Sequence, residues 1–216
     1  MRDPKCYTRS VLKIVLPKYC KGKTVDVGAG RAQYRNLIKK YSDSYVTVDN
    51  LSSSYEFSDK DIKPDIISSV LEMPFEENSF DTVVCTEVLE HVEDPFALMN
   101  EISRILKKGG YCIVSSGWIA AYHREPKDYW RFSPDTYQLL CDKAKLELVE
   151  LHKQGGIFTS LLYLIRRNID LNTIFLKKVR LSLGRINILF ELIAEYLDKL
   201  FVTEDTVGHL IVARKK

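Results

Sequence analysis

The sequence lacks paired cysteines. Its five cysteines include no C-x-x-C pair and lie far apart, at Cys6, Cys20, Cys85, Cys112 and Cys141. This spacing predicts neither a zinc site nor a disulfide framework, and reduced thiols are typical of the cytoplasm. The amino-terminal stretch MRDPKCYTRSVLKIVLPKYC has only a short apolar run, broken by Lys13, which is not a secretory signal. We therefore expect a cytoplasmic protein.

Long apolar runs and a strong charge of one sign are also missing. The stretch QGGIFTSLLYLI, before Arg166, is too short to span a bilayer. A formal net charge of +3 is too small to indicate nucleic acid as a partner. With 216 residues, of which 45% are hydrophobic, the chain has the size of one globular domain. We expect a single domain over residues 1–216.

Strand and helix patterns alternate from residue 24 to about residue 153. We expect strands at 24–28, 45–49, 65–68, 81–86, 110–116, 146–152 and 207–214. Helices are expected at 7–19, 31–41 and 95–107, with another after Ser133, which is placed to cap it. This order predicts an α/β fold with a mostly parallel sheet that is covered by helices on both faces.

Residues 157–202 interrupt this alternation. Apolar residues recur there at helical spacing and predict a helical insertion: Ile186, Leu189, Phe190, Ile193, Leu197, Leu200 and Phe201, opposite Glu191, Glu195 and Asp198. The preceding part is basic, with Arg166, Arg167, Lys177, Lys178, Arg180 and Arg185. Apolar and basic residues together favour peripheral contact with anionic lipid headgroups. A helical lid or a homodimer contact is the simpler alternative.

The stretch TVDVGAGRAQY, residues 24–34, predicts a nucleotide-binding loop between a strand and a helix. In a dinucleotide fingerprint the third small residue would stand at Gln33, whereas here Ala32 is the small residue. The spacing D-x-G-x-G-x-A from Asp26 suits a ligand without a pyrophosphate, such as S-adenosylmethionine, whose ammonium group an acid at the strand end can meet. Asp49 ends the next strand, where a carboxylate can accept both ribose hydroxyls.

Residues 65–116 resemble the segment from the third to the fifth strand of class I S-adenosylmethionine-dependent methyltransferases of the type 11 group. The motifs that carry the resemblance are MPF, SFD, VLEHV and LKKGG, and together with the glycine loop it covers residues 22–116. The resemblance implies a Rossmann-like, seven-stranded, mostly parallel sheet with an antiparallel last strand and the insertion between strands six and seven. It also implies S-adenosyl-L-methionine as the cofactor, at the carboxyl ends of strands one to four.

Carried over by position, the resemblance implies roles for individual residues. Asp26 would orient the amino group of the cofactor, and Asp49 would hold the ribose. Ser69 stands where this family usually has an acid that binds the adenine. The full set implied to bind the cofactor is Asp26, Gly28, Ala29, Gly30, Asp49, Asn50, Ser69, Val70, Leu71, Thr86 and Glu87.

The acceptor site is expected in the stretch GWIAAYHREPKDYWRF, which follows the fifth strand. Aromatic faces beside Asp and Arg suit a sugar, because rings stack on its C–H faces and polar groups bind its hydroxyls. The element DYWRFSP also resembles type 11 enzymes of polysaccharide and lipid-linked glycan biosynthesis. The residues expected to bind the substrate are Trp118, Tyr122, Arg124, Asp128, Tyr129, Trp130 and Arg131, although Asp128–Arg131 could instead be a local ion pair.

Transfer to a hydroxyl needs a base near the sulfonium, and His123 and His91 are the candidates. No metal is assigned, although Glu87, Glu90 and His91 have the i, i+3, i+4 spacing of one helical face and could ligate an ion with His123 or His152. His209 is expected to be structural. The sequence thus favours O-methylation of a sugar hydroxyl on a glycan or lipid-linked saccharide. The alternatives are a small-molecule or quinone-type O-methyltransferase and a non-catalytic scaffold that binds the cofactor.

Overall fold

A single seven-stranded sheet forms the centre of the molecule. The computed structural model describes residues 5–50, 63–123, 127–168 and 183–216. The strands lie in the order β3-β2-β1-β4-β5-β7-β6, and only β7 runs antiparallel to its neighbours. Their bounds are β1 Lys23–Val27, β2 Ser44–Asp49, β3 Ile66–Ile67, β4 Phe80–Thr86, β5 Leu106–Gly117, β6 Leu146–Lys153 and β7 Gly208–Lys215. The predicted fold class and strand direction are confirmed.

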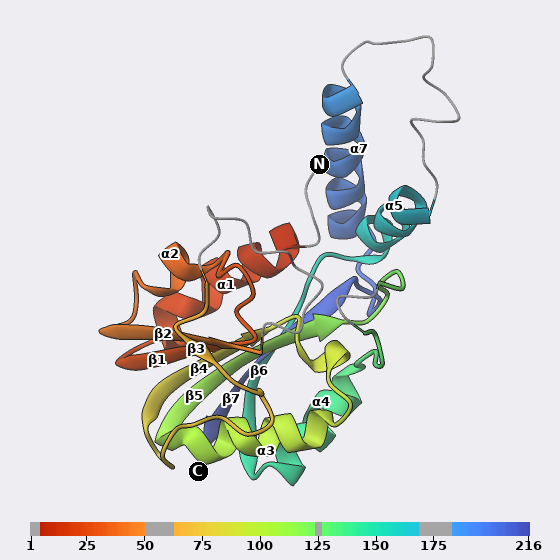
Figure 1. Cartoon of the computed structure of the whole chain (residues 1–216). Helices are drawn as coiled ribbons and strands as arrows, with labels where there is room; N and C mark the ends of the chain where they lie inside the picture. The colour runs from red at the N-terminus through yellow and green to blue at the C-terminus, as the bar shows by residue number, and fades with distance from the viewer. Residues whose placement is uncertain (1–4, 51–62, 124–126, 169–182) are drawn as a thin grey trace.

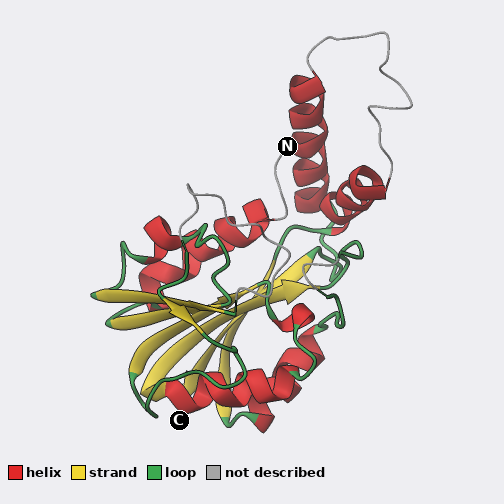
Figure 2. Cartoon of the chain, viewed as in Figure 1, coloured by secondary structure: helices red, strands yellow, loops and turns green. Residues whose placement is uncertain are grey.

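Helices cover both faces of this sheet (Figures 1 and 2). Helices α1 (Lys5–Tyr19) and α2 (Arg35–Ile38) lie on one face, and α3 (Pro95–Ile105) and α4 (Pro134–Lys143) on the other. Two buried apolar clusters fill the layers. One joins Leu12, Leu16 and Ile38 to the sheet, and the other contains Leu98 and Tyr137. Burial of these side chains is the main favourable contribution to this three-layer arrangement.

Helix α3 begins where the sequence predicts and ends earlier. Asp94 caps it by accepting a hydrogen bond from the Ala97 amide (2.9 Å), and Pro95 occupies the first turn. The helix ends at Ile105 because Leu106 is already paired with Phe80 in the sheet. Lys107 then reaches Asp81 on the neighbouring strand (2.8 Å). The LKKGG segment therefore belongs to β5, and the predicted helix to residue 107 is too long.

The helix expected at residues 31–41 is also shorter in the structure. Residues 30–34 form turns, and Ala32 has a left-handed backbone (φ 49°) that a regular helix excludes. Only α2, Arg35–Ile38, is helical in this stretch. The loop after β1 is consequently longer than predicted and occupies the carboxyl edge of the sheet.

Two helices of the predicted insertion lie in the described residues, and they project away from the sheet (Figure 1). Asp198 of α7 (Leu183–Leu200) caps the start of α5 (Ile157–Asn168) by accepting from the amides of Phe158 (2.8 Å) and Thr159 (3.2 Å). Glu191 is buried and Asp198 is partly buried, whereas most of the described residues of the apolar stripe are exposed, with Leu189 56% exposed and Leu200 60% exposed. The acidic face of α7 therefore packs inward.

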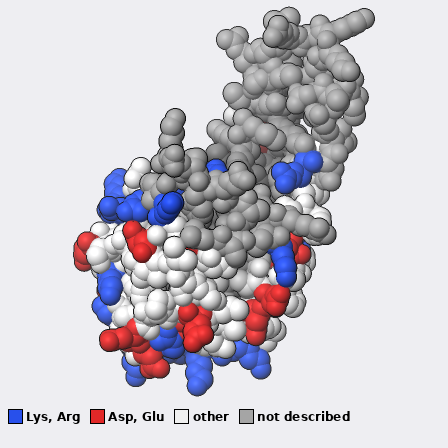
Figure 3. All heavy atoms as spheres, in the orientation of Figure 1, with Lys and Arg blue, Asp and Glu red and all other residues white. Residues whose placement is uncertain are grey.

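Part of the basic half of the insertion can be located. Arg167 lies in the last turn of α5, while Lys177, Lys178 and Arg180 lie outside the described residues, as do the side chains of Arg166 and Arg185. Among the described helices, none is long and apolar enough to cross a membrane. Figure 3 shows Lys and Arg interspersed with Asp and Glu over the described part of one face.

Candidate active site

A cavity of about 570 Å³ lies at the carboxyl ends of β1, β2, β4 and β5. The strand order reverses between β1 and β4, and open α/β sheets bind ligands at this switch point. The cavity lining contains most of the predicted cofactor residues: Gly28, Ala29, Gly30, Asp49, Asn50, Val70, Thr86 and Glu87. Ser69 and Leu71 lie beside Val70 but do not line the cavity.

The glycine loop is shaped by close contacts at Gly28. Its amide donates to the carbonyl oxygen of Val48 (2.8 Å), and its φ of +67° is in the left-handed region. A Cβ atom on Gly28 would lie 2.4 Å from Cγ2 of Val88. Asp49 is tied to the same loop, since its Oδ2 accepts from the Gly30 amide (2.8 Å). The predicted loop and the predicted ribose-binding acid thus form one unit.

Asp26 lies under this loop and is not part of the cavity lining. Its carboxyl group is buried and accepts a hydrogen bond from the Tyr45 hydroxyl (2.7 Å). Burial raises the pKa of Asp26 to about 7. The carboxyl group is therefore poised to ionise when a positive charge binds near it.

The sequence spacing predicted that Glu87, Glu90 and His91 share one helical face. In the structure Glu87 does not share it. Its backbone has a left-handed φ of 56°, and the 3-10 helix η1 begins only at Leu89. The Glu87 carboxylate instead accepts from Ser115 (2.6 Å), Thr8 (3.2 Å) and Gln154 (3.3 Å). A buried polar network from four parts of the chain therefore holds this acid at the cavity wall.

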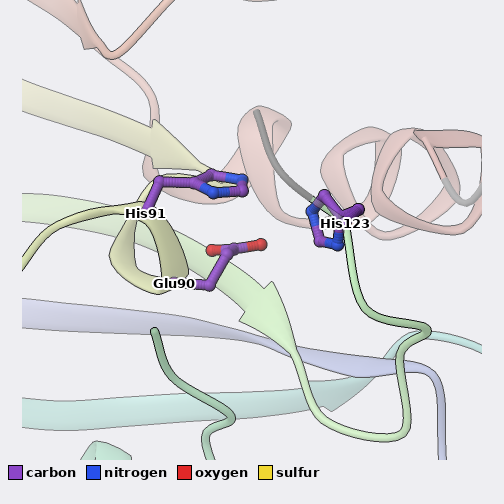
Figure 4. Close-up of side chains that lie close together, drawn as sticks. All are labelled: Glu90, His91 and His123. Atoms are coloured by element: carbon purple, nitrogen blue, oxygen red, sulfur yellow. The ribbon is translucent and has the colours of Figure 1, made fainter. Parts of the chain in front are cut away.

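Glu90, His91 and His123 converge at the other end of the same cavity (Figure 4). The first two come from η1 (Leu89–His91), and His123 comes from the loop after β5. The two imidazole rings lie 5.0 Å apart, edge to face. Glu90 is 1% exposed and accepts from the Ser116 hydroxyl (2.7 Å), and burial raises its pKa to about 8. These side chains could accept a proton or hold a cation.

His123 is placed by Asp128, which the sequence analysis assigned to the substrate. The Asp128 carboxylate accepts from the His123 amide (2.8 Å) and from the Arg131 guanidinium (2.7 Å). Arg131 also donates to the carbonyl oxygens of Ala120 and Ala121 (3.3 Å each). Neither Asp128 nor Arg131 lines the cavity. Their contacts match the local ion pair that the sequence left as the alternative.

The predicted aromatic platform is not assembled in the cavity. Tyr122 is 64% exposed, and Tyr129 and Trp130 are each 41% exposed. Tyr129 donates to Glu93 (2.8 Å), and the Trp130 indole donates to the Val92 carbonyl (3.0 Å). Trp118 does not line the cavity either, and Arg124 lies outside the described residues. Outward-facing rings of an irregular segment cannot be told from inward-facing ones by sequence.

The remaining histidines lie outside the cavity lining. His152, considered as a fourth metal ligand, instead lies 2.7 Å from Glu150. His209 is fully buried beside Tyr137, in agreement with the structural role expected for it.

Several cavity residues were not foreseen from the sequence, and Thr8, Gln154, Tyr163 and Arg167 are among them. Thr8 comes from α1 and Gln154 from the end of β6, and Gln154 donates to the Thr8 hydroxyl (2.9 Å). Tyr163 and Arg167 have i, i+4 spacing on α5, which was the only signal for a shared face. The insertion therefore contributes directly to the cavity wall.

Comparisons with known proteins agree with this geometry. Residues 25–114 match the family model described as a methyltransferase domain. An uncharacterized protein of Methanocaldococcus jannaschii, MJ0638, is 38% identical over 91 residues, which are 42% of this chain and 38% of that protein. The ubiquinone biosynthesis O-methyltransferase of Psychrobacter cryohalolentis is 42% identical over 50 residues, 23% of this chain and 18% of that enzyme.

The fold extends this similarity over nearly the whole chain. A putative methyltransferase from Bacillus halodurans has a TM-score of 0.60 at 18% identity, with 95% of this chain and 97% of that chain covered. By contrast, the chain spans only 38% or less of these two curated relatives. The matched segment and the shared fold agree with the predicted methyltransferase domain.

Proposed function

We propose that the protein, in which residues 25–114 match a methyltransferase domain, transfers the methyl group of S-adenosylmethionine to a hydroxyl group of an acceptor. One observation carries this proposal. The glycine loop and Asp49 line the same cavity as Glu90, His91 and His123. A cofactor on the loop and a hydroxyl beside the histidines would therefore share one enclosed space, as an in-line displacement requires.

The cofactor would be held as the family resemblance implies. Asp49 would accept hydrogen bonds from the ribose, and Thr86 and Glu87, at the end of β4, would lie beside the sulfonium. Asp26 would lose its proton to balance the positive charge of the cofactor. Because the Asp26 carboxyl group is under the loop, it would act through the backbone or a bridging water.

The acceptor oxygen must approach the methyl carbon from the side opposite the sulfur. An oxygen lone pair forms the new bond to the methyl carbon, and the electron pair of the broken C–S bond stays on sulfur. The proton of the hydroxyl must be removed, and His123 and His91 are the proposed bases. The hydrogen bond from the His123 amide to Asp128 fixes the backbone that presents this ring.

For the acceptor, we retain a sugar hydroxyl on a glycan or lipid-linked saccharide. This acceptor is supported by four polar residues of the cavity lining and not by the exposed aromatic segment. The four are Thr8, Gln154, Tyr163 and Arg167. Such groups suit an acceptor with several hydroxyls. A phenol of the quinone-precursor type is the second candidate, favoured by the similarity to a ubiquinone biosynthesis O-methyltransferase.

The test is turnover on matched panels of free sugars, lipid-linked sugars and phenols, with methylated products identified by mass spectrometry. We expect His123→Ala and His91→Ala each to lower turnover by about 100-fold while the affinity for the cofactor is unchanged. His152→Ala is the matched control, because His152 lies outside the cavity lining. Cofactor binding without turnover on any acceptor, in wild type and variants alike, would favour the scaffold alternative.

A further inference from the structure

Glu90, His91 and His123 present ligand atoms that all lie within 4.8 Å of one another. The close-up shows the Glu90 carboxylate directed between the two rings (Figure 4). This separation is wider than in a formed metal site, so the side chains would have to move closer together around an ion. Two imidazoles and a carboxylate form a common ligand set for zinc and for iron(II).

Hydrogen bonds outside this group orient both imidazoles. Nδ1 of His91 contacts the carbonyl oxygen of Lys127, and Nδ1 of His123 lies 3.0 Å from that of Ala121. A carbonyl oxygen only accepts, so an Nδ1 that donates to it leaves the lone pair of the neutral ring on Nε2. Asp128 adds a carboxylate oxygen 3.5 Å from Nδ1 of His123. Metal-binding histidines characteristically have such a partner on the other ring nitrogen.

With an ion bound, Glu90 would supply the negative charge of the group from a buried position. Its side chain is 1% exposed, and the described contact of its carboxylate is the Ser116 hydroxyl at 2.7 Å. A buried carboxylate without a cation is costly, and a divalent ion at the cavity wall would offset that cost. The group borders the cavity, so positions on the ion would stay open to a ligand.

We propose that Glu90, His91 and His123 bind a divalent transition-metal ion, of the zinc or iron class, whose open positions take the acceptor oxygen. This inference rests on the proposed function. Imidazole ligands favour these ions over magnesium and calcium, which prefer oxygen ligands. Glu87 takes no part, because its carboxylate is held by Ser115 and Thr8.

Bound to the ion, the acceptor hydroxyl loses its proton to water more readily, since the ion stabilises the oxyanion. The oxyanion then forms the bond to the methyl carbon, the C–S bond breaks, and its electron pair remains on sulfur. In this form the two histidines are ligands, and the ion replaces them in activating the hydroxyl.

The test measures ion binding itself. The full chain is stripped with a chelator and dialysed, then titrated by calorimetry with Zn²⁺, Mn²⁺ and Co²⁺, and the visible absorption of the Co²⁺ form is recorded. We expect one ion to bind per chain, and we expect the visible spectrum of the Co²⁺ form to be typical of an ion with nitrogen ligands. His91→Ala, His123→Ala and Glu90→Gln should each weaken binding at least tenfold, and Asp128→Asn by about tenfold through the outer contact. His152→Ala should bind as wild type does.

Circular dichroism confirms that each variant is folded before it is compared. Absence of binding to wild type, or equal binding by the folded Glu90, His91 and His123 variants, would overturn the metal site. Cofactor binding and turnover are measured on the same stripped protein. Turnover that survives chelation would leave the proposed function intact and return the role of base to the histidines. Ion binding without cofactor binding would support the site and sink the proposed function.

Discussion

Asp128 and Arg131 form an ion pair that fastens the loop carrying His123. The carboxylate joins the guanidinium (2.7 Å) to the His123 amide (2.8 Å), and the guanidinium in turn holds the Ala120 and Ala121 carbonyls. The Asp128 side chain is fully buried, so these hydrogen bonds are shielded from water. The pair acts on the chemistry through the position of His123.

Asp128→Asn should therefore lower both turnover and stability. We expect a loss of about 1–3 kcal/mol in the free energy of unfolding, because one charge-assisted partner is replaced by a neutral one. Turnover should fall by about 10- to 100-fold as the His123 loop loosens. Urea unfolding and steady-state kinetics check the two effects. Glu147→Gln is the control, because it removes the charge of an exposed carboxylate on β6. Full activity of Asp128→Asn would contradict the role of Asp128 in positioning His123.

The two loop glycines should respond differently to alanine. In Gly28→Ala the new methyl group would lie 2.4 Å from Cγ2 of Val88 on a left-handed backbone, so we expect a loss of about 2 kcal/mol or more in unfolding free energy. Gly30→Ala meets nothing within 4 Å and should lose only about 1–2 kcal/mol from its left-handed φ.

Gly30, like Gly28, borders the cavity, so Gly30→Ala should weaken cofactor binding with the smaller loss of stability. Urea unfolding and calorimetry on both variants separate the effects. Equal losses of stability would show that Val88 yields to the added methyl group.

Asp26 predicts a pH dependence of cofactor binding. Its pKa of about 7, raised by burial, keeps the carboxyl group partly protonated at neutral pH. Binding a positively charged cofactor favours the ionised form, so affinity should rise by about tenfold from pH 6 to pH 8 and a proton should be released. The raised pKa also means that this group's contribution to the stability of the unliganded protein declines from about pH 4 to pH 7.

Calorimetry in buffers of different ionisation enthalpy measures the released proton. Asp26→Asn should flatten the dependence over this range. A wild-type affinity that does not change with pH would show that Asp26 does not respond to the cofactor.

Arg167 should contribute to binding of the acceptor and not of the cofactor. It lines the cavity from α5, which belongs to the insertion and not to the glycine loop. Arg167→Ala should raise the KM for the acceptor by about tenfold, as expected for the loss of one charge-assisted hydrogen bond, and leave the cofactor Kd unchanged. Lys199→Ala, an exposed change on α7, is the matched control. A changed cofactor Kd in Arg167→Ala would place the insertion over the cofactor.

The sequence predicts the residues that would bind the cofactor better than those that would bind the acceptor. Gly28 and Gly30 follow the end of β1, and Asp49 ends β2, its parallel neighbour. A short sequence pattern is therefore enough to predict that these residues lie together. Glu90 and His123 meet because β4 and β5 are neighbours, which depends on strand pairing far apart in the chain. Thr8 and Gln154 meet only through packing of α1 against the end of β6, for which one sequence carries no signal.

Asp128 and Arg131, in the stretch DYWRF, show a second limit of prediction from sequence. Asp128 and Arg131 have the same spacing whether they face a sugar or each other, and only the folded loop selects the second. For α7 the periodicity predicted the helix correctly but not its orientation, because Asp198 is drawn inward by the free amides at the start of α5.

Calorimetric titration of the full chain with S-adenosylmethionine and with S-adenosylhomocysteine, repeated on Asp49→Ala, tests the central claim most directly. The cavity geometry predicts that one molecule of either form binds per chain, and that Asp49→Ala weakens both by about tenfold or more through the lost ribose contacts. Failure of the folded wild-type protein to bind either form would contradict the account.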